Sequence, residues 1–299
     1  MTDPDAVVTV VIVTWNAMPF IEQCLESVRG RDTIVVDHGS TDGTLELVRE
    51  RFPAVRVIEQ ENRGMGGGNN TGMRAADGRY FFLLNADAWV QHDPLTGDGL
   101  DKLVEFADAH PEAAVVGPRL VNTDGTLQRS VRGEPTLWRL ATEYLYIRKL
   151  APHSRRLNAL YAGGFDHDEV MDVDWLYGPA LLIRREAADT VGLFDEDFFM
   201  FSEEVDWMTR FRRAGWKVLF FPDAQVMHVG AASHGGRLYI ENLRGHLRWF
   251  DKHRGAKEAE RVRKLLLWSL RLRALVLRKE QYREGVRFLS SGNARALIK

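Results

Sequence analysis

The first 60 residues alternate between short apolar runs and segments whose apolar residues follow helical spacing. The runs at residues 7–14 (VVTVVIVT), 33–37 (TIVVD) and 55–60 (VRVIEQ) are typical of strands buried on both faces of a parallel sheet. Residues 19–30 and 40–52 lie between these runs and predict two helices. This alternating order predicts an α/β fold with a parallel sheet and right-handed crossovers.

Four later segments also predict regular elements. They are a strand at residues 81–84, a helix at 101–110, a strand and helix within 174–192, and a helix and strand within 201–221. In the last of these, Gly215 ends the helix and the strand runs to Phe221. The pattern loosens over residues 117–170, and from about residue 240 the chain reads as helical nearly to its end.

Polar side chains gather where the predicted strands end. These points are Thr14–Asn16, Asp37–Ser40, Glu61–Gly64 and Asn85–Asp87. Ligands of such sheets bind beyond the carboxyl ends of the strands, so we expect the functional site at this edge. Because side chains two residues apart face the same side of a strand, Asn85 and Asp87 would face one polar site.

Asp37 closes an apolar strand, where a carboxylate can accept hydrogen bonds from a nucleotide base or from ribose hydroxyls. Helix capping is the alternative, and we favour capping for Ser40 and Thr41 but a ligand for Asp37. Asp87 suits a hard divalent cation that bridges two phosphates. His228 follows a later strand and could join Asp87 through its neutral imidazole.

Glu203, Glu204 and Asp206 lie within four residues of one another. Crowded carboxylates raise one another's pKa, which a general base near neutral pH can exploit. An ordinary acidic first turn of a solvated helix is the alternative. The segment 61–80 offers a second ambiguous signal, because five glycines among its first 12 residues indicate either a phosphate-binding loop or a flexible turn before a helix.

Composition indicates a globular protein, with 45% hydrophobic residues and a single cysteine, Cys24. One cysteine allows no disulfide framework or zinc cluster, and it favours a cytoplasmic location. The N-terminus starts with acids and a strand-length apolar run, from which we expect no signal peptide. We also expect no membrane span, because no apolar stretch reaches the length that a span needs.

Charge is distributed unevenly along the chain. Residues 244–299 carry 16 Lys and Arg against 5 Asp and Glu, a net charge of +11, whereas residues 1–243 carry 24 against 37, a net charge of −13. Residues 261–279 interleave leucines and Trp268 with basic residues, as in a helix that lies on an anionic membrane surface. A helix packed on the protein body is the alternative. No nucleic-acid-binding motif accompanies the basic tail, so we expect no nucleic-acid partner.

In their order along the chain, six stretches resemble the inverting family 2 glycosyltransferases. They are VTVVIVTWN, IVVDHGSTDGT, ENRGMGGGNNTG, LLNADAWV, WLYGPALLIRREAADTVGLFDEDFFMFSEEVDW and FFPDAQVMHVGAAS. The resemblance spans residues 7 to about 233, and its collinear order is more specific than any single motif. The chain is most similar to the rhamnosyltransferase-like branch, which often has Leu-Asn-Pro-Asp where this chain has Leu84–Asp87.

The resemblance implies a GT-A fold, a Rossmann-like and mostly parallel central sheet flanked by helices, with a helical C-terminal extension. We expect a GT-A catalytic domain at residues 1–240 and a basic helical extension at 241–299. Within the catalytic domain, the nucleotide-sugar half would cover about 1–117 and the acceptor half about 118–240.

The resemblance also implies the residues that bind the nucleotide-sugar. They are Thr14, Asn16, Asp37, Asp42, Asn62, Gly64, Asn70, Asn85 and Asp87. In this assignment Asp37 holds the base, Asn16 and Asp42 shape its pocket, and Asn70 lies with Gly72 in a loop that positions the donor.

The remaining implied roles concern the metal and the acceptor. Asp87 would bind Mg²⁺ or Mn²⁺, and His228 would join it or touch the diphosphate. Glu204 matches the family's usual general base, with Glu203 and Asp206 in reserve. The acceptor would be bound by Trp175, Tyr177 and Gly178. Two positions depart from the family's pattern: Asn85 stands where many relatives have Asp, and Glu204 stands where Asp is commoner.

The implied function is inverting sugar transfer from a nucleoside-diphosphate donor in cell-envelope polysaccharide synthesis. By resemblance the first candidate donor is dTDP-rhamnose, the second a UDP-sugar, and the acceptor is a glycan or a polyprenyl-diphosphate-linked sugar. A catalytically inactive glycan-binding relative is an alternative, and Asn85 is the strongest argument for it. A nucleotidyltransferase is disfavoured, because TWNAMPF follows the first strand where such enzymes have a basic, glycine-rich phosphate loop.

Overall fold

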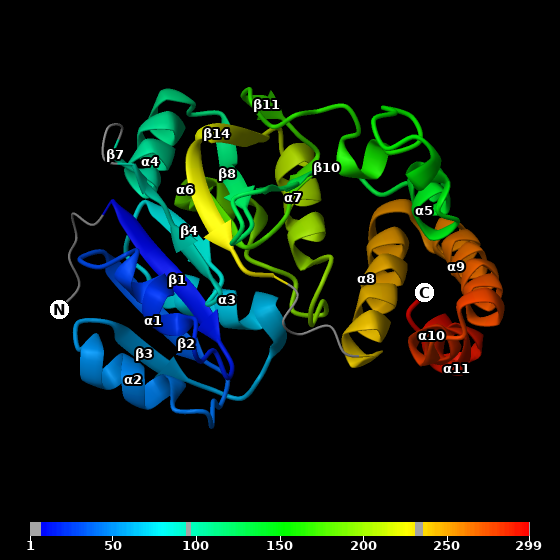
Figure 1. Ribbon diagram of the computed structural model, residues 1–299, viewed down its shortest axis with the longest axis horizontal. Coiled ribbons are helices and arrows are strands. Elements are labelled where there is room, and N and C mark those ends of the chain that lie inside the picture. Colours follow the sequence, from blue (N-terminus) through cyan, green and yellow to red (C-terminus); the bar gives the residue numbers. More distant parts are fainter. Residues whose placement is uncertain (1–6, 94–96, 231–235, 299) are drawn as a thin grey trace.

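The computed structural model describes residues 7–93, 97–230 and 236–298 (Figure 1). Two parts of the sequence-based predictions lie outside the described residues. They are the acidic start of the chain, on which the absence of a signal peptide was predicted, and residues 231–233 at the end of the last resembling stretch.

Within the described residues, a 10-stranded and mostly parallel sheet forms the centre of the molecule. Its strands are β1 (Val8–Thr14), β2 (Asp32–Asp37), β3 (Arg56–Glu59), β4 (Tyr80–Leu84), β5 (Ala88–Val90), β8 (Ala113–Val121), β9 (Leu127–Gln128), β11 (Met171–Asp172), β13 (Ala180–Arg184) and β14 (Lys217–His228). The path runs β11-β14-β8-β13-β4-β1-β2-β3, with β5 beside β14 and β9 beside β8.

Strands β1 to β4 run parallel, as do β8 and β14. Strand β13 runs antiparallel between β4 and β8 and so joins the two parallel sets. Two short ladders lie beside the main sheet, one of β10 (Val131–Arg132) with β12 (Trp175–Leu176) and one of β6 (His92–Asp93) with β7 (Gly97–Asp98). The mixed sheet agrees with the predicted fold class.

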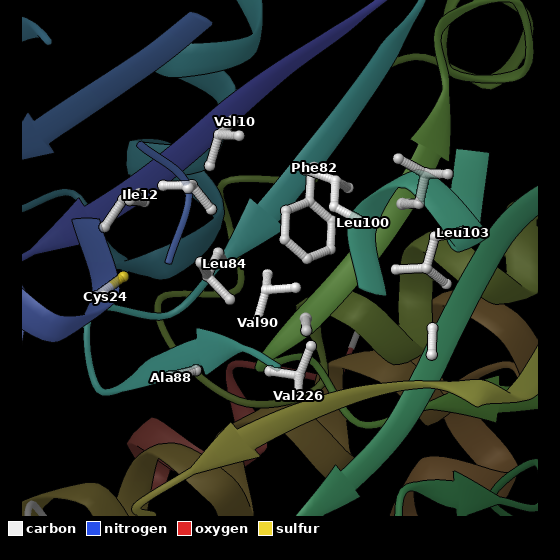
Figure 2. Close-up of a cluster of buried hydrophobic side chains, with 14 of the residues drawn as sticks. Val10, Ile12, Cys24, Phe82, Leu84, Ala88, Val90, Leu100, Leu103 and Val226 are labelled. Carbon is white, nitrogen blue, oxygen red and sulfur yellow. The ribbon is translucent and has the colours of Figure 1, made fainter. Parts of the chain in front are cut away.

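Helices cover both faces of the sheet, so its central strands β1, β4 and β13 are almost entirely apolar and buried. Helices α1 (Ile21–Glu26), α2 (Thr44–Arg51) and α4 (Gly99–Ala109) cover one face, where Val10 and Ile12 meet Phe82 (Figure 2). Helices α3 (Gly64–Ala75), α6 (Arg185–Val191) and α7 (Glu203–Arg213) cover the other, where Val11 joins Trp207. Each fully buried large apolar side chain stabilises the fold by about 1.5–3 kcal/mol.

The C-terminal helices build a third apolar cluster beside the sheet. Helices α8 (Gly236–Arg254), α9 (Ala256–Leu277), α10 (Glu280–Ser290) and α11 (Gly292–Arg295) lie to the right of the sheet in Figure 1, with α5 (Leu137–Tyr144) and the short 3₁₀ segments η1 (Ile147–Leu150) and η2 (Ala159–Tyr161). Leu247 and Leu266 of the extension pack with Leu140 of α5 and Val205 of α7. The extension therefore shares its core with α7.

The glycine-rich stretch is helix α3 rather than a loop, and the loop interpretation was wrong. Its glycines let the helix approach β1 closely. A Cβ on Gly72 would lie 2.3 Å from Val11 Cγ1, and one on Gly68 would lie 2.7 Å from Val13 Cγ1. Gly64 begins the helix with φ +78°, a conformation that favours glycine, and leaves room for the Phe199 carbonyl.

Two other element boundaries differ from the predictions, and two predicted domain limits fall within an element. β14 continues past Phe221 to His228 through an irregularity between Phe221 and Gln225, so His228 is the last residue of that strand. β8 spans the predicted limit between residues 117 and 118, and α8 spans the one between 240 and 241. Helix α2 starts at Thr44, four residues after Ser40, so neither Ser40 nor Thr41 caps it.

Candidate active site

Two loops meet at the carboxyl ends of β1 and β2, where the nucleotide was predicted to bind. The Asn16 side chain accepts a hydrogen bond from the Thr41 amide at 2.8 Å, and Asp42 accepts one from the Met18 amide at 3.0 Å. These bonds hold the two loops together. Thr14 is buried beside them, and its hydroxyl has no partner among the described residues, so it is free to bond a ligand.

Asp37 does not reach out from this edge toward a ligand. Its carboxylate is fully buried and accepts hydrogen bonds from the Gly39 and Ser40 amides and from the Ser40 hydroxyl, at 2.9, 2.8 and 2.5 Å. These contacts match the local turn-forming role of Asp, the kind of bonding that capping residues make. These bonds shape the loop after β2, and the implied role of Asp37 in holding the base stays a prediction.

Next to Asp37, sequence reasoning passed over His38. Its side chain is buried under α3, and its Nε2 lies 3.0 Å from the Gln60 amide nitrogen. The Gln60 oxygen in turn accepts a hydrogen bond from the Thr71 hydroxyl at 2.8 Å. Burial lowers the pKa of His38 against the pull of Asp37. A neutral histidine thus joins β2, β3 and α3 at the nucleotide edge.

The two predicted ligand asparagines of the glycine-rich segment bond the protein itself. The Asn62 side chain is exposed and accepts a hydrogen bond from the Gly64 amide, at the start of α3. Asn70 is buried, and both ends of its amide bond Phe194, with a further bond from its nitrogen to Glu196 at 3.0 Å. Asn70 therefore fastens α3 to the segment before α7 and does not face the donor site.

Asp87 and His228 lie together, as predicted for a metal site. Asn85 and Asp87 follow β4 in a turn, and the Asp87 carboxylate lies 3.4 Å from His228 Nε2. His228 Nδ1 lies 2.7 Å from the Gln128 amide oxygen, which can only accept, so Nδ1 carries a proton. Nε2 therefore faces Asp87 either protonated or with a lone pair that a shared cation could use. Gln128, which orients His228, was missed.

The Asp87 site fits Mg²⁺ or Mn²⁺ as one carboxylate with one imidazole. Burial raises the pKa of Asp87, but the hydrogen bond and charge of His228 outweigh it and hold the pKa below its usual value. The described residues contain no group of three or more His, Cys, Asp or Glu side chains that could hold a metal ion. A cation there would take its other ligands from diphosphate oxygens and water, as Mg²⁺ commonly does.

The three acids at the start of α7 point in three directions. Glu203 is buried against α3, where a Cβ placed on Gly66 would lie 3.7 Å from the Cβ of Glu203. Glu204 interacts electrostatically with Arg132 and Tyr177 on the β10–β12 side. Asp206 faces α8. Of the two glutamates, Glu204 has the larger effect of charge on Tyr177, and Glu203 has a smaller one.

Glu204 has the electrostatics of a base that works near neutral pH. Burial raises its pKa to about 7, against the opposing effects of backbone hydrogen bonds and of Arg132. One oxygen of Glu204 is buried without a protein partner among the described residues, and so is one of Glu203. Burial, and then the neighbouring Glu204, raise the pKa of Glu203 further above its usual value.

Tyr177 lies between the metal pair and the acid pair. Its ring packs edge-on against His228 with centroids 5.8 Å apart. Burial raises the pKa of Tyr177, and the nearest charges adding to this effect are Glu204 and then Asp87. The charges of both carboxylates thus act on one hydroxyl, which indicates that Glu204 and Asp87 face the same region of the molecule.

Two neighbours of Tyr177 complete the predicted acceptor set. The Trp175 indole donates to the Gly133 carbonyl at 2.9 Å and is half-buried. A Cβ on Gly178 would meet no atom within 4 Å, so this position borders open space.

Asp206 cannot serve as a reserve base. It is fully buried and contacts His253 Nε2, Lys252 Nζ and Arg210 Nε at 2.7, 2.8 and 2.9 Å. Burial opposes ionisation, but these hydrogen bonds and charges lower the pKa of Asp206 to about 2. A carboxylate held this strongly by cations has little affinity for a proton, so Asp206 joins α7 to α8.

The turn before α7 is held in an unusual backbone conformation. Phe201 and Ser202 both have positive φ, at +66° and +70°. Gly245 of α8 lets this turn approach, since a Cβ there would lie 2.6 Å from Ser202 Oγ. Two consecutive left-handed residues cost about 1–3 kcal/mol each and persist only where the surroundings hold them. The extension therefore helps to present Glu203 and Glu204.

A separate hollow of about 590 Å³ lies at the opposite edge of the sheet and is not this site. It is lined by Arg79, Arg184 and Arg185. Arg79 pairs with Asp108, and the other two donate to backbone carbonyls. These arginines are occupied by the protein itself.

Comparison with known proteins identifies the family. The family model described as Glycosyl transferase family 2 matches residues 9–165. The chain belongs to glycosyl transferase family 2. An N-acetylglucosaminyl-diphospho-decaprenol L-rhamnosyltransferase of Mycobacterium tuberculosis is 32% identical over 96% of this chain and 97% of its own length. The rhamnosyltransferase resemblance inferred from the motifs is confirmed.

Solved structures share the fold of this family 2 glycosyltransferase. GalNAc-T7, solved with UDP, GalNAc and Mn²⁺, superposes with TM-score 0.60 at 16% identity over 96% of this chain and 56% of that chain. A mannosyltransferase of Pyrobaculum calidifontis, solved with GDP-Man and Mn²⁺, gives TM-score 0.56 at 18% identity over 99% and 88% of the two chains. At this identity the likeness shows the fold alone, and it confirms the GT-A prediction.

Proposed function

We propose that this family 2 glycosyltransferase moves a sugar, with L-rhamnose from dTDP-rhamnose as the first candidate, onto N-acetylglucosamine carried by a polyprenyl diphosphate. The mycobacterial relative, named for that acceptor and that sugar, supports the choice through its coverage of nearly the whole chain. The observation that carries the proposal concerns Tyr177. Burial raises the pKa of its hydroxyl, and the charges of the predicted base Glu204 and the predicted metal ligand Asp87 both add to this effect.

In this mechanism Glu204 removes the proton from the acceptor hydroxyl as that oxygen attacks the anomeric carbon. Its pKa of about 7 leaves a substantial ionised fraction at neutral pH, while the base remains strong enough to accept a proton. Attack from the face opposite the diphosphate would invert the configuration. Glu203 packs against α3, and we assign it no part in the transfer.

Asp87 and His228 would hold Mg²⁺ or Mn²⁺, with Gln128 fixing the imidazole. When bound, the cation would neutralise charge on the departing diphosphate. Thr14, with its free hydroxyl, and the loops joined by Asn16 and Asp42 would surround the nucleotide. Holding both substrates in line supplies much of the remaining acceleration.

The experiment is a transfer assay with dTDP-rhamnose and UDP-sugars against a short-chain GlcNAc-diphospho-prenol, with Mg²⁺, with Mn²⁺ and with chelator. We expect rhamnose transfer that requires a divalent cation and a product of inverted anomeric configuration by NMR. Transfer of another sugar would correct the donor alone. Donor binding without transfer to any acceptor would contradict the proposal and favour an inactive relative.

We further propose that the enzyme works at the cytoplasmic face of a membrane. No helix in the described part of the chain is long and apolar enough to span a bilayer. The buried stripe of α9, with Val262, Leu266 and Leu270, packs inside the extension. The opposite stripe leaves Trp268 and Leu275 60% and 75% exposed. The two alternatives predicted for this helix are thus compatible: one face packs on the protein, and the other is free to contact a membrane.

A further inference from the structure

Arg132 lies on the acceptor side of the candidate base. It ends β10, and it pairs in register with Trp175 of β12. The Leu176 amide of the same strand contacts the sulfur of Met208 on α7, so the β10–β12 ladder lies against the helix that carries Glu204. Arg132 has an electrostatic effect on both Glu204 and Tyr177.

The Arg132 guanidinium has few protein partners. Its Nη1 donates to the Val131 carbonyl at 3.0 Å, and no carboxylate of the described residues forms an ion pair with it. Burial lowers the pKa of Arg132, although part of the residue remains exposed. A guanidinium has five N–H donors, so most of those on Arg132 remain available.

Some partly or fully buried arginines of this chain pair with carboxylates. Arg263 contacts Glu260 and the Leu289 carbonyl, and Arg210 contacts Asp206. Arg132 lacks such a partner, and because a poorly solvated charge without one is costly, an anionic ligand beside the candidate base would stabilise it.

A second cation lies next to Arg132. The guanidinium carbons of Arg132 and Arg148 lie 4.5 and 4.4 Å from the centroid of the Tyr161 ring. Arg148 also pairs with Glu143, whereas Arg132 does not. Stacking on an aromatic ring fixes the plane of a guanidinium and leaves its edge free for two parallel hydrogen bonds.

We propose that Arg132, held against Tyr161 and assisted by the charge of Arg148, binds the diphosphate of the lipid-linked acceptor. A guanidinium edge matches two phosphate oxygens in bidentate geometry. The donor diphosphate is assigned to Asp87 and His228, whereas Arg132 stacks on Tyr161, so the two diphosphates would occupy separate places. Binding the acceptor diphosphate beside Glu204 would bring the adjoining sugar to the base. The acceptor's identity rests on the proposed function.

The first test compares acceptors with and without phosphate. For Arg132→Gln, kcat/KM with GlcNAc-diphospho-prenol should fall about 30- to 100-fold, whereas an alkyl glycoside of GlcNAc should change less than about threefold. Arg132→Lys keeps the positive charge but not the planar guanidinium that can make two parallel hydrogen bonds, so it should give an intermediate loss. Arg49→Gln on the surface of α2 is the control and should behave as wild type. An equal loss with both acceptors would overturn the proposal in favour of a structural role.

The second test needs no transfer and separates this site from the proposed function. Inorganic pyrophosphate is titrated calorimetrically with chelator present, so that no cation recruits it to Asp87. Wild type and Asp87→Asn should bind it alike, and Arg132→Gln should lose binding at least tenfold. Unchanged binding in Arg132→Gln would refute the anion site. Lost binding without transfer from any donor would keep the anion site and contradict the proposed function.

Discussion

The carboxylates of Glu203, Glu204 and Asp206 lie within one helical turn but differ in how readily they are protonated. Glu203 and Glu204 lie in surroundings that favour the protonated form, whereas Asp206 is held ionised by Lys252, His253 and Arg210. Their spacing gives no indication of this, because the groups that decide it come from α3, from β10 and β12, and from α8.

Replacing Glu204 with Gln should reduce transfer at least about 10²-fold, because a general base contributes about that much or more. Donor binding should persist. Glu203→Gln is the matched control and should lose less than about tenfold, since it faces α3. In wild type, kcat/KM should rise with pH through about 7 and then level off. A profile that is flat from pH 5 to 9 would contradict Glu204 as the base.

The same substitution should change how stability depends on pH. The folded-state pKa of Glu204 is raised from 4.5 to about 7, so its stabilising effect is complete below pH 4.5 and is lost as pH rises through 7. Glu204→Gln should therefore melt roughly 2–5 °C above wild type at pH 8, with the difference vanishing near pH 4. Calorimetry at both pH values measures this. A difference that grows toward low pH would show that burial does not raise this pKa.

Asp206→Asn should lower the free energy of unfolding at pH 7 by roughly 2–4 kcal/mol, because it leaves its cations without a partner. Its pKa is lowered to about 2, so the stability that it contributes is present above pH 3.8 and is lost as pH falls through about 2. Urea unfolding measures the change, with the exposed Asp197→Asn as control. Unchanged stability together with lost transfer would instead make Asp206 the base.

Residue types and spacing predicted the site only in part. Asp87 and His228 could be brought together from strand ends, because parallel strands align their carboxyl ends at one edge. Asp37 and Asn70 could not be assigned, because whether a polar side chain bonds its own loop or a ligand depends on neighbours distant in sequence. Gln128 and Arg132 lie in the irregular stretch where no periodic pattern marked them.

At the scale of elements, helix α3 is the clearest departure from the sequence reading. Many glycines in one segment resemble a loop, and glycine is a poor helix former. However, Gly64, Gly68 and Gly72 are four residues apart, which places them on one helical face. That spacing was the available signal. It reflects close packing of α3 on β1, where Val11 and Val13 occupy the space of the missing side chains.

Gly72→Ala should destabilise the enzyme by about 1–3 kcal/mol, because its Cβ would lie 2.3 Å from Val11 Cγ1. Gly292→Ala is the matched control, since a Cβ there meets no atom within 4 Å. Urea unfolding of both variants measures the difference. If the two variants were equally stable, the contact between α3 and β1 would be looser than described.

At the scale of the molecule, the extension is part of the catalytic body. Leu247 of α8 and Leu266 of α9 share a cluster with Val205 of α7, and Gly245 accommodates the turn before the acids. The sequence predicted helices, a basic charge and, as one alternative, a helix packed on the protein body. It did not predict which residues make the contact between α7 and α8, because that depends on tertiary packing. Removing residues 256–299 would also expose this cluster, so surface substitutions are the better test of membrane binding.

The exposed stripe of α9 should bind anionic bilayers. Trp268, Leu272, Leu275 and Val276 recur at helical spacing on its exposed side, and the sequence from residue 244 onward carries a net charge of +11. Changing all four to Gln should reduce binding to phosphatidylglycerol vesicles at least about tenfold while leaving the melting temperature unchanged.

The control for this variant is Val7→Gln with Met171→Gln, two exposed apolar residues outside the extension. Vesicle sedimentation at low and high salt measures binding, which should weaken with salt because the basic residues contribute. Equal sedimentation of the α9 variant and this control would place the membrane contact elsewhere.

The most direct measurement compares Asp87→Asn and Glu204→Gln for donor binding and for transfer in the same preparation. If a cation at Asp87 and a base at Glu204 serve one site, Asp87→Asn should lose cation-dependent binding of dTDP-rhamnose. Glu204→Gln should bind the donor like wild type and transfer almost none of it. Cation-dependent donor binding that survives in Asp87→Asn, or near-normal transfer by Glu204→Gln, would contradict the account.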